Sequence, residues 1–280
     1  MFRIAYNANG LRALSLHDAV RAVAAAGYQG IELSLHPNHI DPQRFTQADA
    51  ESLRTFIHDQ GIHACCLATG ADTLLGSERF EPSLIHPTKS GRQQRIDLLR
   101  WAIDLACWLG VPVVSLASGF RKPEVSTALA HDMLLTSISR CLEHAGTSVT
   151  LAIEPEPGFF VETNAQACAL IQEIRSPYFR LNQDIGHANV CEDDYLQSIE
   201  RSLGLTSHIH VEDIKNRYHH HEIPGDGDID FCEFFRALQD RSYAGYLSVE
   251  LYNHGNVYEE ALSRSLRHLR TMESVARPAA

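Results

Sequence analysis

Lysine is the scarcest charged residue in this 280-residue chain, which contains only Lys89, Lys122 and Lys215. Arginine supplies nearly all of the positive charge, and 24 basic against 35 acidic residues leave a formal net charge of −11. Nucleic acids select proteins that neutralise phosphates with lysine and arginine. The composition therefore argues against a nucleic-acid partner, and any lysine-based chemistry has three candidates.

Paired cysteines and long apolar runs are also absent. The seven cysteines are odd in number and contain no C-x-x-C pair, which favours reduced, mostly buried thiols over a disulfide framework. No apolar stretch approaches the length needed to cross a membrane. The first residues read directly as a strand rather than as a signal peptide. We therefore expect a cytoplasmic protein without a membrane partner.

Short strand-like runs alternate with longer helix-like runs along the chain. Glycine ends several of the helical runs, since it adopts the left-handed C-cap conformation at low cost. The predicted strands are 2–6, 30–33, 62–68, 112–116, 149–153, 179–182, 207–211 and 246–249. The predicted helices are 16–26, 48–60, 92–109, 125–145, 165–174, 231–240 and 257–275.

This alternation predicts an α/β fold in which a parallel sheet closes on itself, a (β/α)8 TIM barrel. An open doubly wound sheet is the main alternative, but the first strand–helix junctions carry neither a G-x-G-x-x-G nor a Walker pattern. No linker or low-complexity stretch interrupts the chain, so we expect residues 1–280 to form a single TIM-barrel domain. The aperiodic loop 71–87 is a candidate lid over the barrel mouth.

Four predicted strands end on residues that can bind a metal ion. Pro155 and Pro157 stop the strand that carries the first of them, because proline cannot continue the ladder. The carboxyl ends of barrel strands meet at the active-site mouth. Three carboxylates and one imidazole suit Mn²⁺, Co²⁺, Mg²⁺ or Zn²⁺. The four candidate ligands are Glu154, Asp184, His210 and Glu250.

Each of these residues also has a plainer interpretation when it is taken alone. Glu154 can simply begin a solvated loop, and Asp184 can cap a turn with His187 as a core imidazole. In His208-Ile-His the two imidazoles point to the same side of a strand. We expect His210 near the mouth as a ligand and His208 one layer deeper, in contact with a ligand or with the substrate.

Other polar residues are weaker candidates for substrate contacts. Glu32 ends the second predicted strand and faces either the mouth or solvent. Lys215 and Arg217 follow the seventh strand and are placed to bind a substrate oxygen. The run 219–221 is His-His-His, which we interpret as a mobile loop that contacts substrate or as a solvated turn.

These stretches together resemble the xylose isomerase-like TIM-barrel superfamily, which includes sugar phosphate isomerases and epimerases, ketose 3-epimerases, inosose dehydratases and endonuclease IV. The resemblance implies that the four strand-end residues hold one divalent metal and that His187 contacts the substrate. Glu156, close behind Glu154, is a further candidate substrate contact. The resemblance also implies that Glu154 and Glu250 flank the substrate carbon that loses and regains a proton. The matching stretches are Ile153-Glu-Pro-Glu-Pro-Gly, Asp184-Ile-Gly-His, His208-Ile-His-Val-Glu-Asp-Ile, Ile223-Pro-Gly-Asp-Gly-Asp-Ile-Asp-Phe and Ser248-Val-Glu-Leu.

The implied activity is that of a metal-dependent sugar isomerase or epimerase, in carbohydrate metabolism, with Mn²⁺ as the expected metal. The substrate would be a ketose or keto-cyclitol, and proton transfer would pass through a metal-stabilised enediolate. Two departures from ketose 3-epimerases concern the substrate. Phe160 stands where they commonly carry another carboxylate, and Asn216, followed by Arg217, stands where they keep an arginine. The family also makes a homo-oligomer possible.

Three other functions fit the same fold. A lyase on the same metal site, such as a dehydratase of a keto-inositol or of dehydroshikimate, would expel a hydroxyl group from the enediolate. A nuclease like endonuclease IV would need a three-metal cluster and a basic groove, which the net charge of −11 opposes. A catalytically silent barrel is the fourth hypothesis, and the intact set of candidate ligands makes it weaker than the enzymatic hypotheses.

Overall fold

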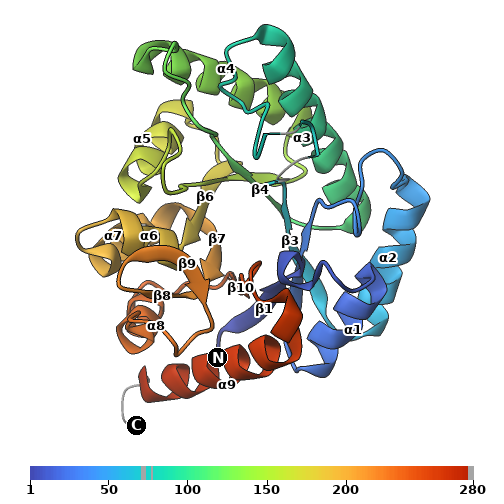
Figure 1. Cartoon of the computed structure of the whole chain (residues 1–280), viewed down its shortest axis with the longest axis vertical. Coiled ribbons are helices and arrows are strands. Elements are labelled where there is room, and N and C mark those ends of the chain that lie inside the picture. The colour runs from blue at the N-terminus through green and yellow to red at the C-terminus, as the bar shows by residue number, and fades with distance from the viewer. Residues whose placement is uncertain (71–73, 77, 277–280) are drawn as a thin grey trace.

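The computed structural model describes residues 1–70, 74–76 and 78–276, and in it helices surround a central ring of strands (Figure 1). Parallel strands close into a barrel in the order β1-β10-β7-β6-β5-β4-β3-β2. The structure confirms the predicted TIM barrel and its eight strands. They are β1 (Arg3–Asn7), β2 (Gly30–Ser34), β3 (His63–Ala68), β4 (Val113–Ala117), β5 (Thr150–Glu154), β6 (Phe179–Asp184), β7 (Thr206–Val211) and β10 (Tyr246–Val249).

The helices lie outside the barrel and most begin at a side-chain cap. Ser15, Thr46 and Ser126, for example, each accept a hydrogen bond from a backbone N–H in the first turn of the following helix. The structure confirms the predicted helices and adds α6 and α7. The helices are α1 (Leu16–Ala25), α2 (Gln47–Asp59), α3 (Lys89–Leu109), α4 (Thr127–Ala145), α5 (Asn164–Ile174), α6 (Ile185–Cys191), α7 (Tyr195–Ser202), α8 (Phe231–Asp240) and α9 (Tyr258–Ala276).

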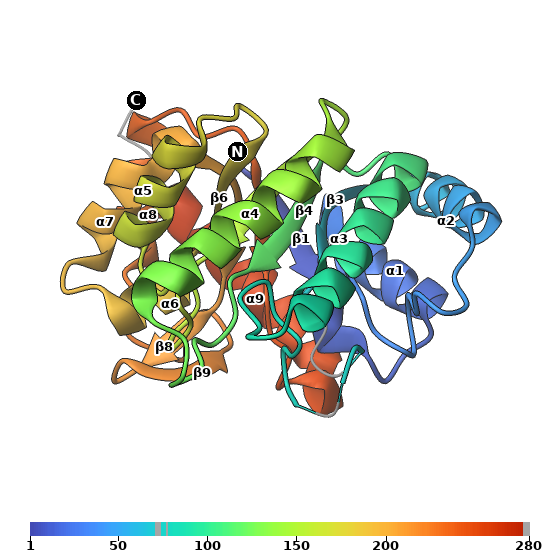
Figure 2. The ribbon, with the colours of Figure 1, turned by 90° about the horizontal axis from the view of Figure 1, so that it is seen from above.

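A short antiparallel hairpin follows β7 and was not predicted. It consists of β8 (Asp213–Lys215) and β9 (Tyr218–Glu222). Figure 2 shows this hairpin at the end of the barrel opposite the N-terminus. It therefore stands beside the carboxyl ends of the strands, where the candidate ligands are expected.

The barrel wall is buried on both faces. All five residues of β2 are buried, and aromatic side chains such as Phe179 and Phe234 fill the layer between barrel and helices. Parallel strands with helices on one side and a filled interior on the other require such continuous burial. Within the described ranges, no helix is both long and apolar enough to span a membrane.

Gly186, at the junction of β6 and α6, is required by close packing. A Cβ atom built there would stand 1.8 Å from Oε1 of Glu212, a fully buried side chain, and 2.9 Å from Cγ1 of Ile214. We expect Gly186→Ala to lower the free energy of unfolding by about 1–3 kcal/mol, because the buried side chains around the new methyl group have no free space in which to move aside. Urea denaturation measures this effect.

Gly204→Ala is the matched control for that experiment. At Gly204, no atom lies within 4 Å of the added Cβ among the residues that the structure describes. The control should therefore keep the wild-type free energy of unfolding. Equal stabilities for the two variants would contradict the tight packing of Glu212 over Gly186.

Candidate active site

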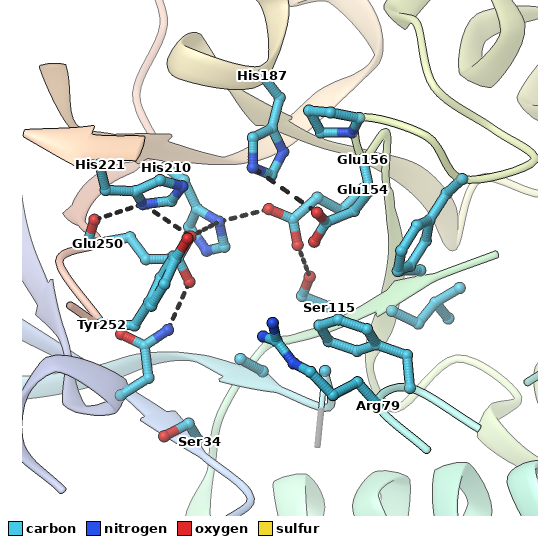
Figure 3. A pocket seen from close by; sticks show the side chains of 18 of the residues that line it. Ser34, Arg79, Ser115, Glu154, Glu156, His187, His210, His221, Glu250 and Tyr252 are labelled. Atoms are coloured by element: carbon cyan, nitrogen blue, oxygen red, sulfur yellow. Dashed lines mark hydrogen bonds and ion pairs between the residues drawn. The ribbon is translucent and has the colours of Figure 1, made fainter. Parts of the chain in front are cut away.

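A cavity of about 350 Å³ opens at the carboxyl ends of the strands. Figure 3 shows polar side chains from different strands and loops converging on it. The residues that carry its chemistry are Ser115, Glu154, Glu156, His187, His210, His219, His221 and Glu250. A cavity of this size with convergent titratable groups is the expected form of a small-molecule site.

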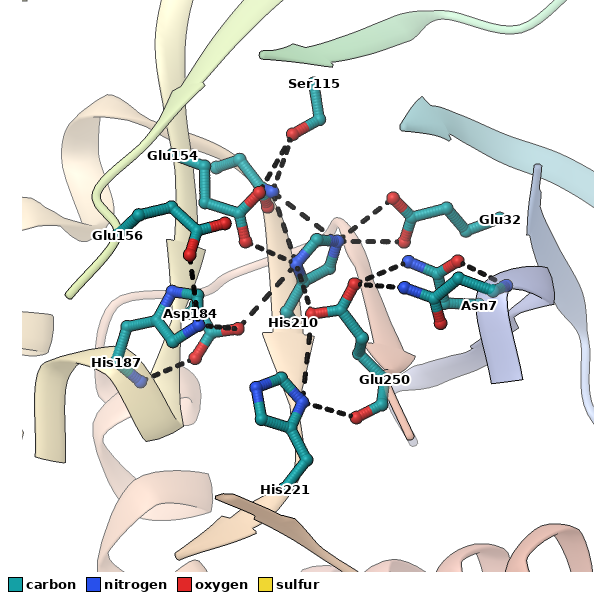
Figure 4. Close-up of polar contacts among 12 residues, drawn as sticks. Asn7, Glu32, Ser115, Glu154, Glu156, Asp184, His187, His210, His221 and Glu250 are labelled. Atoms are coloured by element: carbon teal, nitrogen blue, oxygen red, sulfur yellow. Dashed lines mark hydrogen bonds and ion pairs between the residues drawn. The ribbon is translucent and has the colours of Figure 1, made fainter. Parts of the chain in front are cut away.

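His210 lies at the centre of the four predicted ligands. Its Nδ1 is 2.7 Å from Oε1 of Glu154, 3.5 Å from Oε2 of Glu250 and 3.8 Å from Oδ2 of Asp184 (Figure 4). One donor atom from each of the four residues lies within 4.8 Å of the others, and all four side chains are buried. The structure therefore brings the predicted set together as one candidate metal site.

The second nitrogen of His210 faces Glu32 rather than the cavity. Nε2 of His210 is 3.0 Å from both carboxylate oxygens of Glu32, and Nε2 of His208 is 3.0 Å from Oε2 of the same group. Metal-binding histidines usually donate their other N–H to such a carboxylate, which fixes the ring orientation. Glu32 and His208 are buried and do not line the cavity. Glu32 contacts the ring of His210, and His208 contacts Glu32, so the structure places both residues behind His210 and not at the mouth.

The candidate ligands and Glu32 together carry more negative than positive charge. Burial opposes a proton on His210, but the carboxylates of Glu154 and Glu32 outweigh it and hold the pKa of His210 well above its usual range. Burial, aided by Glu154, raises the pKa of Glu250 to about 8. A divalent cation at this point would relieve the repulsion and keep the carboxylates ionised.

Neutral donors that the sequence did not single out orient the two glutamates. Nδ2 of Asn7 and of Asn9 donate to Oε1 of Glu250 at 3.0 and 2.7 Å. Oγ of Ser115 donates to Oε2 of Glu154 at 3.3 Å. In each glutamate, one carboxylate oxygen is thus anchored while the other faces His210. The only sequence signal for Asn7 was its place directly after a predicted strand.

Asp184 serves both the helix and the site. It is the N-cap of α6, where Oδ1 accepts a hydrogen bond from the N–H of His187 at 2.7 Å, while Oδ2 faces His210. Burial opposes ionisation of Asp184, yet the imidazole of His187 holds the pKa of Asp184 below its usual range. One carboxylate therefore caps α6 with one oxygen and directs the other into the candidate metal site.

His187 lies between Asp184 and Glu156 at the cavity wall. Its Nδ1 donates to the carbonyl oxygen of Pro155 at 2.9 Å, and its Nε2 is 3.7 Å from a carboxylate oxygen of each neighbour. Burial lowers the pKa of His187, but Asp184 and Glu156 outweigh it and raise that pKa to about 9. Glu156 and His187 thus stand where a substrate is expected.

The prediction of a mobile loop or a solvated turn at 219–221 was wrong, because these histidines form most of strand β9. Strand alternation turns His219 and His221 toward the cavity and leaves His220 exposed. His221 is buried, and its Nδ1 donates to the backbone carbonyl of Glu250 at 2.8 Å. The structure therefore adds two imidazoles to the site.

Lys215 and Arg217 lie outside the cavity. Both side chains are exposed, and the guanidinium of Arg217 donates to the carbonyl oxygen of Glu192 at 2.6 Å. The turn between β8 and β9 directs them away from the mouth, and neither residue lines the cavity where we expected them to bind a substrate oxygen. Among the described lining residues, Arg12 and Arg79 supply the guanidinium groups.

An aromatic wall closes one side of the cavity. Phe120 and Phe159 have ring centroids 4.3 Å apart, and Phe80 lies 5.3 Å from Phe159. Phe80 and Arg79 come from the loop that was expected to act as a lid; residues 71–73 and 77 of that loop lie outside the described residues. The lid itself therefore stays a prediction.

Comparison with known proteins agrees with this architecture. The sequence profile described as xylose isomerase-like TIM barrel matches residues 20–272. The chain belongs to this family. The xylose isomerase-like barrel thus accounts for nearly all of the described structure, including the four strand ends that carry the candidate ligands.

Isomerases and epimerases are among the similar sequences and solved structures. A putative hydroxypyruvate isomerase of Danio rerio is 25% identical over 250 residues, covering 85% of this chain and 84% of the relative. L-ribulose-5-phosphate 3-epimerase UlaE of Shigella flexneri is 22% identical over 241 residues, covering 84% and 82%. The structure of an L-ribulose 3-epimerase matches with a TM-score of 0.81 at 21% identity, covering 99% of this chain and 96% of that one.

Proposed function

We propose that this protein is a divalent-metal-dependent isomerase or epimerase that acts on a ketose or keto-cyclitol. One observation carries the proposal: Glu154 and Glu250, on non-adjacent barrel strand ends, both direct a carboxylate oxygen toward Nδ1 of His210 in one cavity. Two carboxylates beside a common point can remove a proton from one side of a substrate and return it from the other. The kinship with sugar isomerases and epimerases supports this reading.

The donor set fits one divalent cation held by Glu154, Asp184, His210 and Glu250. Three hard oxygen donors and one nitrogen favour Mn²⁺, and Co²⁺, Mg²⁺ or Zn²⁺ satisfy the same donors. When bound, the cation supplies Lewis acidity toward a substrate carbonyl and an adjacent hydroxyl oxygen, which makes the neighbouring C–H more acidic. The contact between Nε2 of His210 and Glu32 supports this assignment, because it leaves Nδ1 for the cation.

The side chains around the cation would move the proton and hold the substrate. One glutamate of the pair Glu154 and Glu250 takes the proton, and the other returns it to the opposite face in an epimerase or to the next carbon in an isomerase. Glu156 and His187 are placed to contact substrate hydroxyl groups from the cavity wall. The aromatic wall excludes water on the other side. A cytoplasmic location and a homo-oligomer stay predictions.

Exchange in D₂O tests the proposal. We expect deuterium at one carbon of a ketose or keto-inositol, without loss of water, when a panel of such sugars is incubated with the Mn²⁺-loaded protein. Release of water with exchange would instead select the dehydratase. Absence of exchange across the whole panel, with the metal bound, would contradict the proposal and favour a silent barrel.

Glu32 offers a test of the metal site that does not depend on the substrate. We expect Glu32→Gln to weaken metal binding about 10–100-fold, since it removes the charged acceptor behind the His210 ring. Competition with a fluorescent chelator measures this affinity. Glu143→Gln, the same change at an exposed position of α4, is the control. Unchanged affinity in Glu32→Gln would show that Glu32 does not act through His210.

A further inference from the structure

The two sides of the cavity differ in charge. Glu154 ends β5, and Glu156 and His187 follow β5 and β6, so these residues line one side of the cavity. Arg12 and Arg79 line the same cavity from the segments after β1 and β3. In the closed order of the barrel, β1 lies across the ring from β5. A substrate in this cavity therefore meets carboxylates and imidazoles on one side and guanidinium groups on the other.

The segment that carries Arg79 is anchored before and after this residue. Nζ of Lys122 donates to Oε2 of Glu78 at 2.9 Å. On the other side of Arg79, the buried guanidinium of Arg95 donates to the carbonyl oxygen of Phe80 at 3.1 Å. Arg95 belongs to α3, so the helix layer around the barrel holds this segment in place. These contacts give Arg79 a defined position at the edge of the cavity.

The backbone of Phe80 also points to a ligand-binding segment. Its φ of 61° lies in the left-handed region, which is uncommon for a residue with a bulky side chain. Such conformations persist where the surrounding structure holds them, and they are concentrated at ligand-binding sites. The ring of Phe80 lies in the aromatic wall, and the guanidinium carbon of Arg79 is 5.1 Å from the centroid of that ring. Figure 3 shows Arg79 reaching into the cavity from the side opposite His187.

Guanidinium groups select the chemistry of the ligand that they bind. They present N–H donors in a fixed planar arrangement and have no acceptor, so they match the oxygens of a carboxylate or a phosphate better than a hydroxyl group. The apolar ring beside Arg79 lowers the local dielectric constant, which strengthens the attraction of this guanidinium to an anion. The arginine side of the cavity is therefore suited to an oxyanion.

We propose that the substrate carries an anionic group, a carboxylate or a phosphate, and that Arg12 and Arg79 bind it. The inference rests on the proposed function and narrows its substrates to those with a charged group away from the reacting carbons. Binding of the anion by the arginines directs the carbonyl end of the substrate toward Glu154 and Glu250. Charge-assisted hydrogen bonds of this kind favour the anionic form over the neutral sugar by about 10- to 100-fold in affinity.

Calorimetry on the Mn²⁺-loaded full chain tests this inference without the need for turnover. The probes are fructose, tagatose and sorbose, each as the free sugar, as its terminal phosphate and as its terminal carboxylate. We expect at least one anionic form to bind about 10- to 100-fold more tightly than its free sugar, and the preferred form distinguishes phosphate from carboxylate. Arg79→Gln should lose this advantage, and Arg79→Lys, which keeps the charge, should retain part of it. Arg54→Gln, at an exposed position of α2, is the control and should retain all of it.

Two binding results would overturn the inference. One is a panel in which no anionic form binds more tightly than its free sugar, and the other is an advantage that survives in Arg79→Gln, because the anion would then be held elsewhere. Deuterium exchange with the same panel separates this inference from the proposed function. Exchange of the free sugars with the same kcat/KM as the anionic forms would contradict the anionic substrate and leave the isomerase chemistry intact. Tighter binding of an anionic form without any exchange would support the arginine site and contradict the isomerase.

Discussion

Replacing Glu154 or Glu250 by glutamine is expected to reduce interconversion of the two substrate forms by about 100- to 10,000-fold. Glutamine keeps the shape of the side chain and one oxygen donor, but it cannot carry the proton. Turnover and deuterium incorporation, measured in parallel, provide the readout.

The two variants should also differ in which epimer of the substrate still exchanges its hydrogen for deuterium. If each glutamate serves one face of the substrate, each single variant retains deuterium exchange for only one of the two epimers. Glu143→Gln, on the exposed side of α4, should behave as wild type. Wild-type turnover in either Glu154→Gln or Glu250→Gln, at equal metal content, would exclude that residue as a proton carrier.

Replacing His210 by alanine should cost both the metal and stability. The substitution removes the imidazole that is the only nitrogen donor among the four candidate ligands. The same ring also faces the carboxylates of Glu32, Glu154 and Glu250. Leaving buried carboxylates without their partner typically costs about 3–5 kcal/mol. We expect a loss of that size in the free energy of unfolding of the metal-free protein, measured in urea, together with loss of bound Mn²⁺.

His58→Ala is the control for this substitution, because His58 is exposed on α2 and its nearest ionic partner, Asp59, is exposed as well. The control should keep both the metal and the wild-type stability. A His210→Ala protein that still binds one Mn²⁺ with wild-type affinity would show that His210 is not a ligand.

The strand ends could be predicted from the sequence because local signals mark them. Proline follows Glu154 directly, and a glycine stands two residues after Asp184, so each strand stops within reach of its functional side chain. The parallel closure of the barrel then brings ends that are far apart in the chain to one mouth, as between β5 and β10. This reasoning reached all four candidate ligands.

The position of Glu32 could not be predicted, because the pairing of β2 with β3 shifts register between Ile31 and Glu32. A shift of this kind breaks the alternation of inward and outward side chains. Counting along the strand therefore cannot say whether Glu32 faces the mouth or the interior. The structure places it in the interior, beneath His210.

The hairpin residues escaped prediction for a different reason. The side on which His219 and His221 lie is set by the pairing of β9 with β8, as between Tyr218 and Lys215. A three-residue strand such as β8 carries too little periodicity to be recognised in sequence. The same hairpin that buries His221 leaves Lys215 exposed, so missing this element misplaced both residues.

Anomalous scattering at the manganese edge, from crystals grown with Mn²⁺, tests the central claim most directly. The proposed site predicts one peak bounded by Glu154, Asp184, His210 and Glu250, with Nδ1 of His210 as the nitrogen ligand and Nε2 turned to Glu32. A map without a peak at this point, or with manganese held by other residues, would contradict it.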